Sequence, residues 1–273
     1  MKEIDSQIKI IEGEIKEQDQ LEEVFSLLRN YNEPDQVVPS EMFKDMQTAP
    51  LYILKTKIPT LDKITEGFKS GDLIVISAPT KEGKTTLAMT LTRNLPKQCL
   101  FFSYEIPNKE LLLKYGQGNQ FYLPLQMKST SLQWIEERIV EAIAKYEIKM
   151  VFIDHLHYLF DLAQIRNPSL ELGAIMRILK KIAIKYDIVI GVVAHTTKTK
   201  PEKDIDLSDI RDSSFISQEA DFVIMLSRKR SKERNKIFDD EVKISVQANR
   251  RTGKTGSFIA TIKNQFFEEI YYE

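Results

Sequence analysis

The chain has 273 residues, of which 42% are hydrophobic and 29% charged, and its formal net charge is −1. That length and hydrophobic content predict one large globular domain with a short appendage. The near-neutral charge excludes a protein that binds nucleic acid through bulk positive charge, and the single cysteine excludes a disulfide within the chain.

The N-terminal sequence MKEIDSQIKI lacks the continuous apolar core of a signal peptide. No apolar run approaches the roughly 20 residues of a membrane span. Cys99 lies within an apolar run, so we expect it in the core rather than in a reactive site. We therefore expect a soluble protein of a reducing, intracellular compartment such as the cytoplasm, with a nucleoid, a phage-infected cell or an organelle as narrower settings.

The first 50 residues differ in pattern from the rest. Residues 4–30 predict one or two amphipathic helices. Their apolar positions at mostly helical spacing are Ile4, Ile8, Ile11, Ile15, Leu21, Phe25 and Leu28. Residues 30–50 are polar and contain three prolines, which is typical of a linker. We therefore predict a helical arm and linker over 1–50, which packs on its own domain or docks on a neighbouring subunit, and a second domain over 51–273.

Short apolar runs alternate with longer helical patterns in the second domain. The runs that predict buried parallel strands are 73–77, 99–103, 150–154, 188–194 and 222–226. The patterns that predict helices between them are 85–95, 131–147 and 170–187. Residues 241–272 instead predict consecutive strands joined by turns. The expected fold is α/β, with a mostly parallel central sheet and an antiparallel C-terminal extension.

Two stretches match the pattern A-x-x-x-x-G-K-T, which is a phosphate-binding P-loop with alanine at its first position: residues 78–85 and 248–255. Only the first lies between a predicted strand and a predicted helix, so its backbone amides and the helix N-terminus can converge on phosphates. The second leads into another strand, and with Gly253 and Gly256 it predicts a hairpin turn.

The first stretch therefore predicts a site for ATP and Mg²⁺. Lys84 would reach the β and γ phosphates, the Thr85 hydroxyl would bind Mg²⁺, and Gly83 would let the backbone approach the phosphates. The predicted nucleotide-binding residues are Ala78, Pro79, Thr80, Lys81, Glu82, Gly83, Lys84, Thr85 and Thr86.

Polar residues at the ends of the neighbouring strands complete this prediction. Asp154 ends the run 150–154, the position of a Walker B carboxylate beside the Mg²⁺ that Thr85 holds. Glu105 follows the run 99–103, where a carboxylate can orient and polarise an attacking water. His195 ends the run 188–194, where it can sense the γ phosphate and relay its state to the next loop.

The long polar loop after His195 carries four basic residues, Lys198, Lys200, Lys203 and Arg211. Basic side chains on such a loop suit a nucleic-acid backbone, although a solvated flexible loop would have the same composition. His155 and His157 follow Asp154 and would suit a transition metal. We do not favour that site, because Asp154 is assigned to Mg²⁺ and no further cluster of Cys or His ligands is evident.

In this order, these segments resemble the replicative helicases of the DnaB and Twinkle type, which belong to the RecA-like ATPases. The resemblance runs from about residue 56 to 265 and rests on four segments: 58–91 with the P-loop, FSYEIPN with Glu105, VFIDHLHYL with Asp154, and LSDIRDSSFISQEADFVIML. His195 falls where Twinkle-like and phage members have histidine. The ordered set is more specific than any one motif.

The resemblance implies a six-subunit ring with ATP at the subunit interfaces and single-stranded DNA in the channel, gripped by the loop after His195. It implies that Arg228 packs on the nucleotide base and that Gln218 is the family's motif glutamine. It also implies that Arg250 completes the neighbouring subunit's ATP site in trans. The family's accompanying lysine is replaced by Ala248, for which Arg251 or Lys254 would have to compensate.

The resemblance further implies partners on other chains, namely a separate primase, polymerase or loader. Two alternatives to a helicase stay open. One is a recombination or annealing ATPase that forms filaments on DNA. The other is a KaiC-like or loader ATPase that uses ATP as a switch without unwinding, which the missing lysine at position 248 favours.

Overall fold

The structure is a computed structural model that describes residues 25–26, 28–29, 37, 39–40, 52–159, 168–195, 218–230 and 238–271. The chain divides into two units, Met1–Pro50 and Leu51–Glu273. In the first unit, residues 25–26 and 28–29 are helical, and the rest of the arm helices predicted over 4–30 lies outside the described residues.

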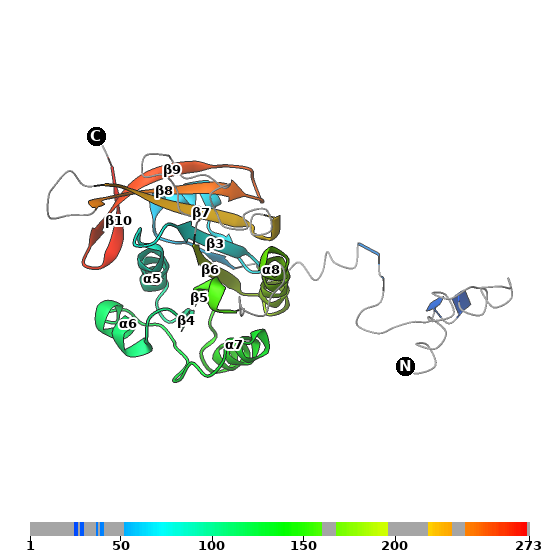
Figure 1. Cartoon of the computed structure of the whole chain (residues 1–273). Coiled ribbons are helices and arrows are strands. Elements are labelled where there is room, and N and C mark those ends of the chain that lie inside the picture. The colour runs from blue at the N-terminus through cyan, green and yellow to red at the C-terminus, as the bar shows by residue number, and fades with distance from the viewer. Residues whose placement is uncertain are drawn as a thin grey trace. The chain divides into compact units, whose positions relative to one another are not determined.

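An eight-stranded sheet forms the centre of the second unit, in the order β10-β9-β8-β7-β3-β6-β5-β4 (Figure 1). The strands β7, β3, β6, β5 and β4 are parallel, and β8, β9 and β10 extend the sheet in antiparallel pairs. Their bounds are β3 Leu73–Ala78, β4 Cys99–Ser103, β5 Met150–Asp154, β6 Val189–His195, β7 Phe222–Arg230, β8 Phe238–Asn249, β9 Gly256–Lys263 and β10 Phe266–Ile270. The predicted fold class is confirmed.

Helices cover both faces of the parallel part of the sheet (Figure 1). Their bounds are α4 Pro59–Thr65, α5 Lys84–Asn94, α6 Asn108–Tyr115, α7 Leu132–Tyr146, the 3₁₀ helix Leu156–Leu159 and α8 Pro168–Lys185. A small separate sheet pairs β1, Ile53–Leu54, with β2, Phe68–Lys69. None of the described helices has the length and apolar composition needed to cross a membrane.

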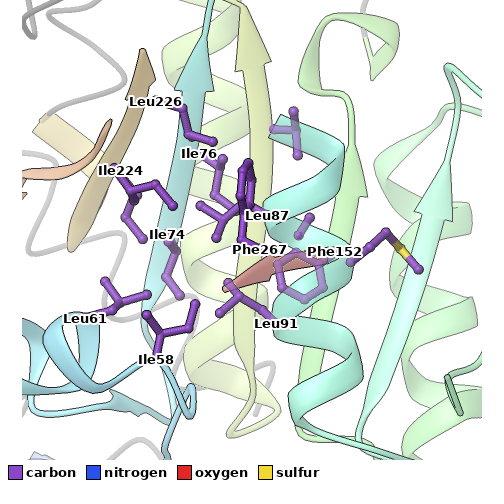
Figure 2. Close-up of a cluster of buried hydrophobic side chains, with 14 of the residues drawn as sticks. Ile58, Leu61, Ile74, Ile76, Leu87, Leu91, Phe152, Ile224, Leu226 and Phe267 are labelled. Atoms are coloured by element: carbon purple, nitrogen blue, oxygen red, sulfur yellow. The ribbon is translucent and has the colours of Figure 1, made fainter. Parts of the chain in front are cut away.

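Side chains along β3 alternate between the two faces of the sheet, so this strand contributes to the apolar cluster on each face. Ile74 and Ile76 pack with Leu87 and Leu91 of α5 in one apolar cluster (Figure 2). Leu73 and Val75 point the other way, into the cluster that contains α7 and α8. Because both faces of β3 are buried, its sequence is a continuous apolar run rather than an alternating one.

The turns at the helix ends are encoded locally. Ser131 caps α7, since its hydroxyl accepts a 3.3 Å hydrogen bond from the Trp134 amide. Helix α5 begins directly after Gly83, whose φ of 100° lies in the left-handed region that glycine adopts without strain. This start directs the N-terminus of α5 toward the carboxyl edge of the sheet.

Candidate active site

Four parallel strands end at the same edge of the sheet, each at or within two residues of a position that the sequence analysis connects with the site. In the strand register, Ala78 of β3 pairs with His195 of β6, and Ser103 of β4 pairs with Asp154 of β5. This edge is where open α/β sheets bind their ligands. The strand order thus brings the predicted nucleotide-binding residues and acids together.

Lys84 is the first residue of α5, and its side chain folds back over the loop. Its ammonium donates 2.9 Å hydrogen bonds to the carbonyls of Ala78 and Pro79. Burial lowers the pKa of Lys84 to about 8, and the nearby carboxylates of Asp154, Glu105 and Glu82 oppose that shift. A phosphate at this position would exchange the two carbonyls for charged acceptors.

The backbone at Gly83 requires glycine for two reasons. Its φ of 100° disfavours other residues, and a Cβ there would lie 2.8 Å from Cζ of Phe267 in β10. Phe267 is fixed in turn, because its amide donates a 2.9 Å hydrogen bond to the Thr90 hydroxyl of α5. The antiparallel extension therefore packs against the P-loop, which nothing in the sequence of β10 indicates.

Thr85 and Asp154, the two predicted Mg²⁺ ligands, are in contact. The Thr85 hydroxyl donates a 2.7 Å hydrogen bond to Oδ2 of Asp154. Asp154 is almost fully buried, and desolvation raises its pKa to about 6. Its other oxygen, Oδ1, is buried without a hydrogen-bond partner among the described residues. A hydroxyl beside a buried, unsatisfied carboxylate oxygen is a donor set that fits Mg²⁺.

Glu105 lies in the turn after β4, tied to the end of β5. The amides of Tyr104 and Glu105 donate to the Asp154 carbonyl at 2.6 and 3.3 Å. The Glu105 side chain is 40% exposed and faces a pocket of about 420 Å³. The pocket also contains Lys84, Thr85, His195 and Arg228. One cavity thus collects the P-loop, the predicted general base, the predicted phosphate sensor and the predicted base-contacting arginine.

Some residues that line this pocket were not singled out by the sequence analysis. Tyr115 ends α6, and its hydroxyl is 3.1 Å from the Thr86 hydroxyl. Ile262 and Gln265 come from β9 and its turn into β10. These residues are distant in sequence from the P-loop, so no local motif identifies them.

The P-loop carries a buried acid, Glu82, that ties it to β7. The Glu82 carboxylate accepts a hydrogen bond from the Arg228 amide, and burial raises the pKa of Glu82. Pro79 is half-buried, and Thr80 and Lys81 are exposed at the tip of the loop. Arg228 is therefore held beside the P-loop through its backbone.

His155 lies beside two other potential metal ligands, Glu105 and His195, a grouping that the sequence analysis did not anticipate. His155 and His195 are in ring contact, with centroids 4.4 Å apart, because β5 and β6 are adjacent and both end there. His155 Nε2 lies 4.0 Å from Oε2 of Glu105. One ligand atom from each of Glu105, His155 and His195 lies within 4.8 Å of the others, close enough to hold a metal ion.

Both histidines are neutral near pH 7. Burial lowers the pKa of His155 to about 3 and that of His195 to about 4, and the positive charge of Lys84 acts in the same direction. His157 also disfavours a charge on His155. A neutral His195 beside the phosphate pocket can donate or accept a hydrogen bond without adding charge.

The second A-x-x-x-x-G-K-T stretch forms the turn between β8 and β9, as predicted. Val246 pairs with Gly256, and the Gly253 amide donates a 2.8 Å hydrogen bond to the Asn249 carbonyl. Strand β9 follows it directly in place of a helix, so it lacks the helix N-terminus that a P-loop presents to phosphate.

Arg250 lies in this turn, at the opposite edge of the sheet from Lys84. Asn249 pairs with Phe222, which pairs with Ile74 at the start of β3. Since β3 advances about 3.3 Å per residue, roughly 15 to 20 Å separate this edge from the P-loop. Gln218 lies here too, in a pocket of about 340 Å³ with Arg250. Both residues therefore lie away from the pocket that contains Lys84.

The predicted substitutes for the missing lysine have other partners. Arg251 donates to the carbonyls of Thr65 and Gly67, at 2.7 and 2.6 Å. Lys254 pairs with Glu66 at 2.8 Å. Both side chains thus have partners within the chain, whereas the exposed Arg250 side chain has none among the described residues. The predicted DNA-binding residues Lys198, Lys200, Lys203 and Arg211 lie outside the described residues.

Comparison with known families identifies the domain to which this arrangement corresponds. The model of the DnaB-like helicase C-terminal domain matches residues 54–117 and 119–269. Curated proteins that match include a probable replicative DNA helicase of Trieres chinensis, 25% identical over 93% of this chain and 63% of that protein. The replicative DNA helicase DnaB of Treponema pallidum is 26% identical over 85% of this chain and 59% of its own length. The chain thus spans about three fifths of these relatives.

Solved structures share the fold at lower identity. One of them, described as an ATPase domain, matches with a TM-score of 0.70 and 18% identity, over 85% of this chain and 96% of that one. A DnaB-like replicative helicase, described together with its interactions with primase, matches with a TM-score of 0.69 and 19% identity, over 97% of this chain and 75% of that one. These similarities show the same fold.

Proposed function

Because the chain belongs to the family of DnaB-like helicase C-terminal domains, we propose that it is an ATP-driven, ring-forming DNA helicase that translocates on single-stranded DNA in replication. One observation carries the proposal. The pocket beside Lys84 gathers the groups needed to bind and hydrolyse ATP, while Arg250 is exposed on the opposite edge of the sheet. A site divided in this way would be completed by a second subunit.

The P-loop side of the pocket would bind ATP with Mg²⁺. The amides of residues 79–84 and the Lys84 ammonium would hold the phosphates, and Thr85 with Oδ1 of Asp154 would bind the metal. The metal would supply positive charge to the phosphates. Glu105 would accept a proton from the attacking water, and its tie to the Asp154 carbonyl would hold it in position.

The opposite edge would serve the neighbouring subunit. Arg250 would stabilise charge on the transferring phosphoryl group of that neighbour, with Gln218 beside it. An interface that joins unlike edges repeats head to tail and closes into a ring when the rotation permits. This supports the hexamer that the family resemblance implies.

Two further roles complete the proposal. His195 would couple the state of the γ phosphate to the loop that follows it, whose residues Lys198, Lys200, Lys203 and Arg211 would contact the DNA backbone. Arg228 would pack on the nucleotide base. A separate primase, polymerase or loader would act with the ring, and we place this work inside the cell, in the cytoplasm or nucleoid.

ATP hydrolysis measured with and without single-stranded DNA tests the proposal. The wild-type chain should hydrolyse ATP faster with DNA, and particles seen by electron microscopy should be closed rings. Filaments on DNA would favour the recombination alternative. ATP binding with hydrolysis that DNA does not stimulate would favour the switch or loader.

A further inference from the structure

We infer that Arg251 is a positioning residue for Arg250: it fixes the β8–β9 turn to its own subunit so that Arg250 points toward the neighbour's ATP. The inference rests on the proposed role of Arg250 in trans. The two arginines are adjacent in sequence but have different proposed roles. One binds inside the subunit, and the other reaches out of it.

One nitrogen of the Arg251 guanidinium, Nη2, is hydrogen-bonded to the segment from the end of α4 to the start of β3, while Nη1 and Nε make no hydrogen bond among the described residues. Nη2 donates to the carbonyls of Thr65 and Gly67, at 2.7 and 2.6 Å, and Nη1 lies 3.5 Å from Oδ2 of Asp72. The guanidinium carbon stacks 4.9 Å over the ring of Phe222. The side chain is only 22% exposed. A planar guanidinium can stack on a ring, donate two hydrogen bonds from one nitrogen and pair with a carboxylate through another, a combination that the lysine ammonium lacks.

Asn249, on the other side of Arg250, is fixed to the same segment. Its Nδ2 donates to the carbonyl of Ile64 at 3.1 Å and to the Thr252 hydroxyl at 2.8 Å. Its Oδ1 accepts the amides of Arg251 and Thr252, both at 3.2 Å. The side chain of Asn249 therefore organises the turn from within.

The backbone of Arg250 is also held. Its amide donates a 2.8 Å hydrogen bond to the Asp221 carbonyl. The Asp221 carboxylate accepts the Leu73 amide at 2.7 Å and pairs with Lys180 at 2.5 Å, so Asp221 is locked to the start of β3. By contrast, the Arg250 guanidinium has no hydrogen-bond or ion-pair partner within the described part of the chain.

Hydrogen bonds thus fix the backbone of the turn at Arg250 and on both sides of it, while the Arg250 side chain has no partner among the described residues. Charge stabilisation in a transition state depends on geometry, and a misplacement of about 1 Å can cost roughly 100-fold in rate. With alanine at position 248 and Lys254 paired to Glu66, Arg250 is the exposed cation of the turn that has no partner among the described residues. Loosening the turn should therefore impair the neighbour's hydrolysis and leave the subunit's own ATP binding intact.

The test compares Arg251→Met and Arg251→Lys with Arg250→Ala in the full-length chain. Arg251→Met should lower the kcat of ATP hydrolysis by about 10- to 100-fold, with the affinity for a fluorescent ATP analogue changed by less than about twofold. Arg251→Lys keeps the charge and should recover part of kcat. Lys254→Met, which breaks the exposed pair with Glu66 on the same turn, is the matched control and should stay within about twofold of wild type.

Mixed rings separate a role in trans from a role in folding. Each variant is co-expressed with Lys84→Ala on a second affinity tag and purified through both tags. Lys84→Ala subunits have a defective P-loop but an intact Arg250 turn. Because unlike edges meet in a head-to-tail ring, about one quarter of the interfaces pair two intact halves when the two kinds of subunit mix randomly in equal amounts. Arg251→Met rings should gain ATPase activity when mixed in this way, as Arg250→Ala rings should.

The outcomes are distinguishable. Wild-type kcat in Arg251→Met would overturn the inference. A second outcome would also overturn it: mixing restores the kcat of Arg250→Ala but leaves the kcat of Arg251→Met low. Arg251 would then act only within its own subunit. If mixing fails to restore Arg250→Ala itself, the proposed role of Arg250 in trans is wrong, and the inference fails with it.

Discussion

The Thr85 hydroxyl donates a 2.7 Å hydrogen bond to the Asp154 carboxylate, which joins the first turn of α5 to the end of β5. The bond holds the two proposed Mg²⁺ ligands side by side before any metal binds. It satisfies only one carboxylate oxygen, and the other is buried without a partner among the described residues. A buried carboxylate oxygen without a partner lowers the stability of the fold, which is the cost expected of the proposed Mg²⁺ site.

That cost predicts the behaviour of Asp154→Asn in metal-free buffer. The folded pKa of Asp154, about 6, lies above its ordinary value of 3.8, so the folded protein binds this proton more tightly than the unfolded chain does. The free-energy cost of burying the ionised carboxylate is absent below pH 3.8, grows as the pH rises from 3.8 to about 6, and is complete above that. Asp154→Asn should be more stable than wild type at pH 7.5, by about 3 kcal/mol at most, and the gain should shrink at pH 4.5. Urea unfolding at both pH values measures this. An equal gain at both would contradict it.

Glu105→Gln should separate ATP binding from hydrolysis. The amide cannot accept a proton from water, so kcat should fall by about 100-fold or more, while ATP affinity stays within about threefold. Steady-state kinetics and binding of a fluorescent ATP analogue measure the two effects. Glu110→Gln, an exposed acid of α6, is the control. A loss of affinity that matches the loss of kcat would mean that Glu105 acts mainly in binding.

The histidine pair should make the protein sensitive to acid. His155 faces His195, His157, Lys84 and Glu105, and its folded pKa of about 3 lies below the ordinary 6.5. The unfolded chain therefore binds a proton that the folded chain does not, so stability falls as pH drops below about 6.5.

His155→Asn removes one of these groups and should reduce the loss of melting temperature between pH 7.5 and pH 5. Thermal unfolding at both pH values is the measurement. His157→Asn removes one of the groups that lower the pKa of His155 and should have a smaller effect than His155→Asn. If His155→Asn loses as much melting temperature as wild type, a desolvated His155 does not explain the acid sensitivity.

Restoring a lysine at position 248 should strengthen hydrolysis. Ala248 borders the pocket of about 340 Å³ with Gln218 and Arg250, so a longer side chain has space there. Arg251 and Lys254 are bound within the subunit and do not supply this cation. Ala248→Lys should raise kcat by a few-fold, with Ala248→Met as the control for size. Equal effects of both variants would exclude charge as the cause.

Much of the fold follows from local sequence pattern. The runs at 99–103 and 150–154 match β4 and β5, because buried parallel strands are continuous apolar stretches. Helix α6 was missed, since its eight residues include two exposed leucines and give little periodicity. Strand β7 extends to Arg230, beyond the apolar run, because β8 pairs along it.

The sequence predicted the P-loop residues and Asp154 well, but it did not predict the histidine contact or the surroundings of Arg250. Lys84, Thr85 and Asp154 belong to motifs whose geometry is fixed by a strand and the following helix. The contact of His155 with His195 depends on β5 and β6 being adjacent, which one sequence does not reveal. The position of Arg250 at the far edge, and the binding of Arg251 to the α4–β2 turn, depend on the register of β7 and β8.

Unwinding of a forked DNA duplex with ATP tests the central claim most directly. Wild-type chain, Lys84→Ala and Arg250→Ala are compared at equal subunit concentration, with strand separation followed by fluorescence. The proposed function predicts that wild type unwinds the fork, that Lys84→Ala fails because it cannot bind ATP productively, and that Arg250→Ala binds ATP but fails to unwind. Wild-type hydrolysis without unwinding, or unwinding that neither substitution reduces, would contradict it.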